Sequence, residues 1–148
     1  MRVSELFEEP IRLQLSGPSP KVKAFIKKMY DKYEESPMNP HQHVIYLNKE
    51  AGKQELALFE LVPSPHKKLG DAVELKWIQA YPQRSGVGGK ALKIIQDAAR
   101  EAGIKLSLFP TDQGAISQTK LIKFYKKYGF KMMGGPRKDM HWEPEDAA

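Results

Sequence analysis

A glycine-rich turn flanked by cations is the stretch of this sequence best suited to chemistry with a charged ligand. Three glycines stand within residues 86–89, where they let the backbone approach a ligand closely. An amphipathic helix follows, so its first backbone amides and the positive end of its dipole form an anion site. Arg84 and Lys90 add full positive charges beside that site. We therefore expect residues 83–90 to bind the phosphate groups of a cofactor.

Two familiar phosphate-binding motifs fit this turn poorly. A P-loop requires G-x-x-x-x-G-K-[ST], but Arg84 stands at its first glycine and Ala91 at its Ser/Thr position, which excludes this class. A dinucleotide fingerprint, G-x-G-x-x-[GA], does match residues 86–91. Only about sixty residues follow it, however, which is too few for a doubly wound dinucleotide-binding sheet.

The stretch Gln83-Arg84-Ser85-Gly86-Val87-Gly88 satisfies a third pattern, Q-x-x-G-x-G. Placed between a strand that ends at a proline and a helix, it resembles the acyl-CoA pyrophosphate loop of the GNAT superfamily of N-acetyltransferases. A second stretch, residues 124–130, resembles the FYxxxGF segment that closes the last helix of that family. The two motifs occur in the family's order, and the resemblance extends over residues 72–133.

The resemblance implies acetyl-CoA (coenzyme A) as co-substrate, with no metal. The strand before the loop would bind the pantetheine arm as an extra strand might, and the loop amides would hold the pyrophosphate. Gln118 stands where many relatives have an asparagine that contacts the pantetheine. The implied coenzyme-binding residues are Ile78, Gln79, Ala80, Gln83, Arg84, Ser85, Gly86, Val87, Gly88, Gly89, Lys90 and Gln118.

Acyl transfer from a thioester to an amine needs a base, because a primary amine with a pKa of about 10.4 is mostly protonated at neutral pH. Glu74 precedes the loop on the central strand, at the place where some similar protein-acetylating relatives carry their base. Its alternative role is a surface glutamate paired with Lys76. Glu60, on the preceding strand, is the reserve candidate for the base.

The leaving thiolate needs a proton, and Tyr125 is the candidate acid. The resemblance implies this role, because Tyr125 occupies the family's tyrosine position, four residues before Gly129. A phenol with a pKa of about 10 can protonate a thiolate. Helical spacing by itself would instead predict an aromatic residue of the core.

The chain has a formal net charge of +6 and contains no cysteine. The charge fits either attraction to a polyanion or solvated lysines on the outer faces of helices. The lack of cysteine excludes disulfides, a thiolate nucleophile and cysteine metal sites. The N-terminus lacks the apolar segment of a signal peptide, and no stretch approaches about eighteen uninterrupted apolar residues. We expect a cytoplasmic protein with no membrane span.

The four histidines give no sign of a metal site. His41 and His43 lie two residues apart without a third ligand nearby, so we expect them to be polar loop residues. Nothing around His66 or His141 indicates a function. The two tryptophans are expected in the core.

Hydrophobic periodicity predicts one α/β domain over residues 1–148 with a mixed sheet. The element order is similar to that of the GNAT family, and the resemblance implies a GNAT-like mixed, mostly antiparallel sheet of about six to seven strands flanked by helices. Ser19 and Ser117 are expected to cap two helices, and Gly103 to end a third. A second helix before Val44 is expected to be short or absent. The expected strands are residues 11–15, 44–47, 54–62, 73–81, 104–109, 130–133 and 139–142, and the expected helices are residues 20–34, 91–102 and 118–128.

We therefore expect an acetyl-CoA-dependent N-acetyltransferase in which the acceptor attacks directly within a ternary complex, since no thiol offers a covalent route. The favoured acceptor is a primary amine on a small molecule or a protein. Two alternatives stay open: an RNA-linked amine such as aminoacyl-tRNA, and a non-catalytic acyl-CoA-binding domain. The expected partners are an acyl-CoA and an amine acceptor, with nucleic acid not favoured, and the expected state is a monomer or homodimer.

Overall fold

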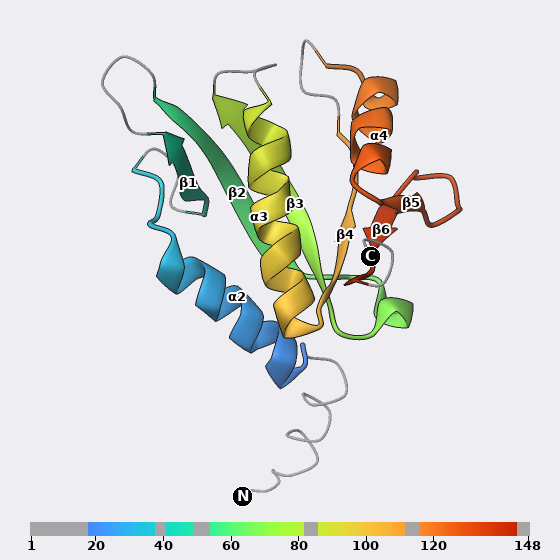
Figure 1. Ribbon diagram of the computed structural model, residues 1–148. Coiled ribbons are helices and arrows are strands. Elements are labelled where there is room, and N and C mark those ends of the chain that lie inside the picture. Colours follow the sequence, from blue (N-terminus) through green and yellow to red (C-terminus); the bar gives the residue numbers. More distant parts are fainter. Residues whose placement is uncertain (1–17, 38–40, 49–53, 82–85, 112–115, 145–148) are drawn as a thin grey trace, which may run out of the picture.

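A computed structural model describes residues 18–37, 41–48, 54–81, 86–111 and 116–144. These residues form a six-stranded sheet in the order β1-β2-β3-β4-β6-β5, with helices α2 and α3 in front of it in Figure 1. Among them, no helix is long and apolar enough to cross a membrane. The elements are α2 (Pro20–Lys32), β1 (His43–Asn48), β2 (Glu55–Pro63), a 3-10 turn (Lys67–Leu69), β3 (Ala72–Tyr81), α3 (Val87–Ala102), β4 (Lys105–Leu108), α4 (Gln118–Lys127), β5 (Lys131–Met132) and β6 (Met140–Trp142).

The sheet is mixed and mostly antiparallel, as the sequence predicts. Strands β1, β2 and β3 form an antiparallel meander, and β3 then pairs with β4 in parallel. Strand β6 inserts antiparallel between β4 and β5, so the last strand of the chain is not at the edge. The long crossover between the parallel strands carries α3, as a parallel connection requires.

Two of the helices begin at the serines that the sequence predicts. The Ser19 hydroxyl accepts a hydrogen bond from the Val22 amide at 3.2 Å, and Ser117 accepts one from the Lys120 amide at 3.3 Å. Each bond satisfies one of the amides that a helix N-terminus leaves without a partner. Helix α3 ends at Gly103, whose φ of 67° is the left-handed conformation expected of a C-terminal glycine.

Three sequence predictions need correction or fall outside the described residues. Helix α3 begins at Val87 rather than after Lys90, so the last two glycines of the turn belong to its first turn. His43 is not a loop residue: it begins β1 and is 8% exposed. The predicted strand at residues 11–15 lies outside the described residues. Between α2 and β1, residues 33–37 and 41–42 are described and form no helix, in line with the prediction that a second helix before Val44 is short or absent.

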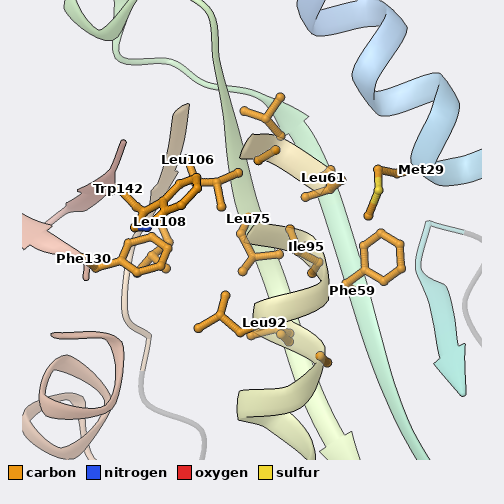
Figure 2. Close-up of a cluster of buried hydrophobic side chains, with 14 of the residues drawn as sticks. Met29, Phe59, Leu61, Leu75, Leu92, Ile95, Leu106, Leu108, Phe130 and Trp142 are labelled. Carbon is orange, nitrogen blue, oxygen red and sulfur yellow. The ribbon is translucent and has the colours of Figure 1, made fainter. Parts of the chain in front are cut away.

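The core fills the space between α2, α3, α4 and one face of the sheet. In Figure 2, Met29 of α2 points toward Phe59 of β2, and Leu92 and Ile95 of α3 project toward the strands. Trp142 is fully buried, as predicted, whereas the side chain of Trp77 lies outside what the structure describes. The buried core consists of Val22, Phe25, Met29, Ile45, Ala57, Phe59, Leu61, Val73, Leu75, Ile78, Ala91, Leu92, Ile95, Ala99, Ile104, Leu106, Leu108, Leu121, Tyr125, Phe130, Met140 and Trp142.

A bulge in β3 sets which side chains of this strand face α3. Glu60 of β2 pairs with Trp77, but the next residue, Leu61, pairs with Leu75, so Lys76 is an extra residue in the ladder. Such an insertion shifts the alternation of side chains by one residue. Leu75 and Ile78 consequently both belong to the core beneath α3, although they are three residues apart.

Candidate active site

A cavity of about 240 Å³ opens where β3 and β4 diverge. Within the described residues, the parallel ladder between these strands has three pairs, the last of which joins Glu74 to Ser107. Figure 1 shows the two strands separating beyond that end, with α4 on the β4 side and the start of α3 on the β3 side. The cavity is lined by Ile78, Gln79, Ala80, Gly86, Gly88, Gly89, Ile116, Leu121, Phe124 and Tyr125.

The glycine turn forms one wall of this cavity through the N-terminus of α3. Gly86 is the N-cap and has a φ of 84°, a conformation that side-chain-bearing residues rarely adopt. It offers no side-chain oxygen to the first amides of α3, unlike the serine caps of α2 and α4. The first turn of α3 also contains no acidic residue. An anion therefore meets amide donors there and no competing carboxylate from that turn.

The two glycines inside α3 have different neighbours. A β-carbon on Gly88 would lie 3.6 Å from Cβ of Ala80 and 3.9 Å from Cζ of Phe124, which are ordinary contact distances. Gly88 therefore keeps the cavity wide. A β-carbon on Gly89 would instead overlap the hydroxyl of Tyr128 and lie 2.9 Å from its Cζ. Gly89 is thus required by the packing of α4 against α3.

A buried amide reinforces this contact between α3 and α4. Gln96 of α3 is 4% exposed, and its Nε2 donates a hydrogen bond of 2.7 Å to the carbonyl of Tyr128, the C-terminal cap residue of α4. This bond satisfies a helix-terminal carbonyl and a buried amide together. The two helices on either side of the cavity are therefore joined at Tyr128.

Tyr125 lies on the α4 wall of the cavity. It is 5% exposed and packs edge-on against Phe124 and Phe130, at ring-centroid distances of 5.2 and 5.6 Å. Burial raises the pKa of its phenol to about 12, because the phenolate would lose its hydration. Tyr125 is therefore protonated at neutral pH and can donate a proton or hydrogen bond to a group in the cavity.

Glu74 does not line the cavity. Its Oε1 accepts a hydrogen bond of 3.2 Å from the Ser107 hydroxyl and lies 3.8 Å from Nε2 of His66, on the other face of the sheet. Its side chain is 19% exposed. Lys76, the alternative partner that the sequence offered, forms no ion pair with Glu74 within the described residues. The described structure thus places Glu74 at the point where β3 and β4 diverge, apart from Tyr125.

The remaining predicted coenzyme residues are distributed unevenly. Lys90, which directly follows Gly89 in α3, is exposed, and Val87 is fully buried. The amide of Gln118 donates to the carbonyl of Pro110 at 2.9 Å and lies outside the cavity lining. Gln83, Arg84 and Ser85 lie outside the described residues. Six of the twelve predicted residues line the cavity: Ile78, Gln79, Ala80, Gly86, Gly88 and Gly89.

Other residues of this region were not predicted to belong to the site. Leu121 and Phe124 line the cavity, although Phe124 entered the prediction only as the first residue of the FYxxxGF segment; the helical spacing that places both beside Tyr125 is a signal that could have indicated them. His66 lies between Glu74 and Asp139, with its Nε2 3.8 Å from Oε1 of Glu74 and 3.5 Å from Oδ2 of Asp139, and no local pattern marks this arrangement. Within the described ranges, no group of three or more histidine and acidic side chains is arranged to hold a metal ion.

No protein-family model matches the chain, and no curated protein sequence matches it. Its fold does resemble solved structures. The anti-CRISPR protein AcrVA5 shares 22% identity at a TM-score of 0.50, over 68% of this chain and 98% of that one. AtaTR bound with AcCoA shares 17% identity at a TM-score of 0.51, over 95% of this chain and 82% of that one. The KacTA–DNA complex shares 13% identity at a TM-score of 0.49, over 95% of this chain and 82% of that one. The first two likenesses confirm the predicted fold class, a GNAT-like α/β fold with a mixed, mostly antiparallel sheet.

Proposed function

We propose that this protein is an acetyl-CoA-dependent N-acetyltransferase whose acceptor is a primary amine of a small molecule or a protein. The observation that carries the proposal is the cavity itself, which is lined both by the glycine-rich N-terminus of α3, where no side chain caps the first amides, and by the protonated phenol of Tyr125. A fold like that of AtaTR, which was solved bound with AcCoA, supports the same ligand.

The residues of the cavity suit a long ligand with one anionic end. The amides at the start of α3 would hold the pyrophosphate, with Lys90 and Arg84 contributing charge nearby. Ile78, Gln79 and Ala80 of β3 would lie along the pantetheine arm. The apolar side chains of Leu121 and Phe124 would exclude water from the thioester.

The chemistry would proceed by direct attack of the amine nitrogen on the thioester carbonyl carbon. As the carbon–nitrogen bond forms and the carbon–sulfur bond breaks, Tyr125 would give its proton to the departing thiolate and regain one from solvent. Glu74 would take the proton of the incoming amine through water, since its carboxylate lies outside the cavity lining. Glu60 remains the reserve candidate for this base.

The first test is thermal unfolding of the full chain with acetyl-CoA, NAD or ATP. A ligand at about a hundred times its dissociation constant stabilises the native state by ~2.7 kcal/mol, which raises the Tm of a domain of this size by several degrees. We expect that rise with acetyl-CoA alone. A rise with NAD or ATP instead, or none with acetyl-CoA, would contradict the proposal.

Turnover then separates an enzyme from a non-catalytic acyl-CoA-binding domain. Release of free thiol from acetyl-CoA should depend on an added amine, and Tyr125→Phe should lower kcat by about a hundredfold, the usual contribution of a positioned acid. Acetyl-CoA binding without amine-dependent release would support the binding domain. An RNA-linked acceptor would instead show activity that falls steeply as salt rises, whereas a small amine should respond little.

A further inference from the structure

Tyr125 belongs to the closing turn of α4, which is built as a Schellman motif. The carbonyl of Tyr125 accepts hydrogen bonds from the amides of Tyr128 and Phe130, at 2.9 and 3.2 Å. The amide of Gly129 donates to the carbonyl of Lys126 at 3.1 Å, and the φ of 90° at Gly129 turns the chain back toward the helix. The ring of Phe130 packs on Tyr125 at a centroid distance of 5.6 Å. This turn therefore holds Tyr125 and Tyr128 in a fixed relation.

The phenol of Tyr125 depends on this turn for its place in the cavity. Within the described residues, burial is the only cause of its raised pKa, and neither a hydrogen bond nor a charge contributes. The rings of Phe124 and Phe130 pack edge-on against it, and such contacts hold a ring without fixing its hydroxyl to a partner. A shift of the last turn of α4 would therefore carry the hydroxyl with it.

Side chains attach this turn of α4 to α3. Helix α3 runs close along strands β1 to β4, whereas α4 approaches no described element over a comparable stretch. Gln96 of α3 donates from Nε2 to the carbonyl of Tyr128 at 2.7 Å, the shortest hydrogen bond between the described parts of these two helices. Because Gln96 is 4% exposed, this bond is shielded from water and is electrostatically stronger than a surface bond. The Tyr128 hydroxyl lies against Gly89 in the first turn of α3.

The bond between Gln96 and Tyr128 relates the two walls of the cavity to each other. The glycine turn at the start of α3 forms one wall, and Tyr125 lies on the other. Gln96 is not among the residues that line the cavity, so it can influence a bound ligand only through its neighbours. Without the bond, a buried amide and a buried carbonyl would both lack a partner. A displacement of α4 toward water would relieve that cost.

We infer that Gln96 is a positioning residue, which holds the Tyr125 hydroxyl at the reacting end of the cavity through its hydrogen bond to the Tyr128 carbonyl. The inference rests on the proposed function where it makes Tyr125 the acid. An acid must lie within hydrogen-bond reach of the group that it protonates, so a small displacement of the phenol costs rate. The placement of the ring by Gln96 does not itself depend on acetyl transfer.

The structural test follows the ring resonances of Tyr125 in the full chain by NMR, at a temperature where every variant is folded. Their absence from Tyr125→Phe identifies these resonances, and the neighbouring rings of Phe124 and Phe130 make them sensitive to position. Gln96→Met keeps the length of the side chain and removes the donor, so it should shift them. Glu101→Met, at an exposed position of the last turn of α3, is the matched control and should leave them in place.

Gln96→Glu separates the hydrogen bond from packing, because a protonated carboxyl can donate to the Tyr128 carbonyl and an ionised one cannot. As the pH falls through the pKa of the introduced carboxyl, which burial raises above about 4.3, the Tyr125 resonances should return to their wild-type positions. Gln96→Met, measured over the same range, accounts for every other titrating group. Wild-type positions in both variants, or a Gln96→Glu spectrum that follows Gln96→Met at every pH, would overturn the inference.

Turnover measures the catalytic consequence. Gln96→Met should lower kcat about tenfold and change the KM for acetyl-CoA by less than about twofold, since Gln96 does not line the cavity. In the Tyr125→Phe background it should cause no further loss, because the group that it positions is gone. An equal loss in both backgrounds would overturn the inference and leave the proposed function standing. A Tyr125→Phe variant with wild-type kcat would contradict the proposed function, and the NMR spectra would still decide whether Gln96 positions the ring.

Discussion

The hydroxyl of Tyr128 occupies the space that a β-carbon on Gly89 would need. This contact places the end of α4 against the first turn of α3, beside the glycine turn expected to bind phosphate. The neighbours of these adjacent glycines also show that each is glycine for a different reason. Gly88 leaves room in the cavity, whereas Gly89 leaves room for a neighbouring helix.

Gly89→Ala should destabilise the protein, because the tyrosine ring is stiff and must move together with α4. We expect a loss of about 1–3 kcal/mol in the free energy of unfolding, measured by urea denaturation. Gly88→Ala is the matched control. It adds the same methyl group at ordinary contact distances and should be neutral or slightly stabilising, since alanine favours helix over glycine. Equal losses in both variants would contradict the packing argument.

Combining Gly89→Ala with Tyr128→Leu should recover part of the stability lost by Gly89→Ala. The shorter side chain no longer reaches the new methyl group, so the two changes should not be additive. A double-mutant cycle on the same unfolding curves measures this coupling. Strict additivity would show that the contact between these residues does not set the position of α4.

Gly88→Val should weaken acetyl-CoA binding while preserving the fold, because its branched side chain would enter the cavity beside Ala80 and Phe124. We expect at least a tenfold rise in Kd by calorimetry, a loss of about 1.4 kcal/mol of binding energy. Gly86→Val makes a poorer test, since the left-handed φ at that position would cost stability in its own right. Unchanged affinity in Gly88→Val would separate the cavity from the cofactor.

Tyr125→Phe should alter how stability depends on alkaline pH. Burial raises the folded-state pKa of Tyr125 to about 12, above the ordinary value of 10.0. Its contribution is therefore fully present below pH 10 and is lost as the pH rises toward 12, by about 2–3 kcal/mol. Compared with wild type, Tyr125→Phe should lose less stability over that window in denaturant melts. Parallel curves for the two proteins would contradict the burial of an ionisable phenol.

His43→Phe should make the protein less sensitive to acid. His43 stacks on Tyr30 at a centroid distance of 3.8 Å, and burial lowers its pKa below 6.5, although Glu35 opposes the shift. The folded state thus favours the neutral ring, and stability is lost as the pH falls below 6.5 toward the lowered pKa.

Phenylalanine keeps the stacking and removes the titration. Between pH 7.5 and 5, the variant should therefore lose less stability than wild type in thermal melts, roughly in proportion to the pKa shift. His41→Phe, at an exposed position two residues away, is the control and should follow wild type. Identical acid sensitivity in His43→Phe and wild type would contradict the prediction.

Local signals predicted much of the fold. Ser19 and Ser117 begin helices because a hydroxyl before a helical stretch satisfies a free amide, and this depends on neighbouring residues alone. The hairpin of β1 and β2 follows from two apolar stretches close in the chain. By contrast, the start of α3 was misplaced because glycine disfavours helix locally, while contacts of Gly88 and Gly89 with Ala80, Phe124 and Tyr128 hold the helix there.

The candidate site was also predicted only in part, because local motifs do not show which distant residues pack together. The glycine turn and Tyr125 are marked by short motifs, and both line the cavity. The partners of Glu74 are not marked, because His66 reaches it from the loop before β3 and Ser107 from β4, and no local pattern pairs them. His43 looked like a loop residue because its burial depends on Tyr30 of α2.

The sequence by itself determined the order of the described elements, the first residues of α2 and α4, and the position of a glycine-rich turn that we expect to bind an anion. Each of these depends on interactions within a few residues, so composition and spacing suffice. The tertiary structure decided where β3 and β4 diverge, the insertion of β6 between β4 and β5, and the gathering of Glu74, His66 and Asp139 on one face. Those features depend on strand pairing and packing between distant segments, whose free energy no local pattern encodes.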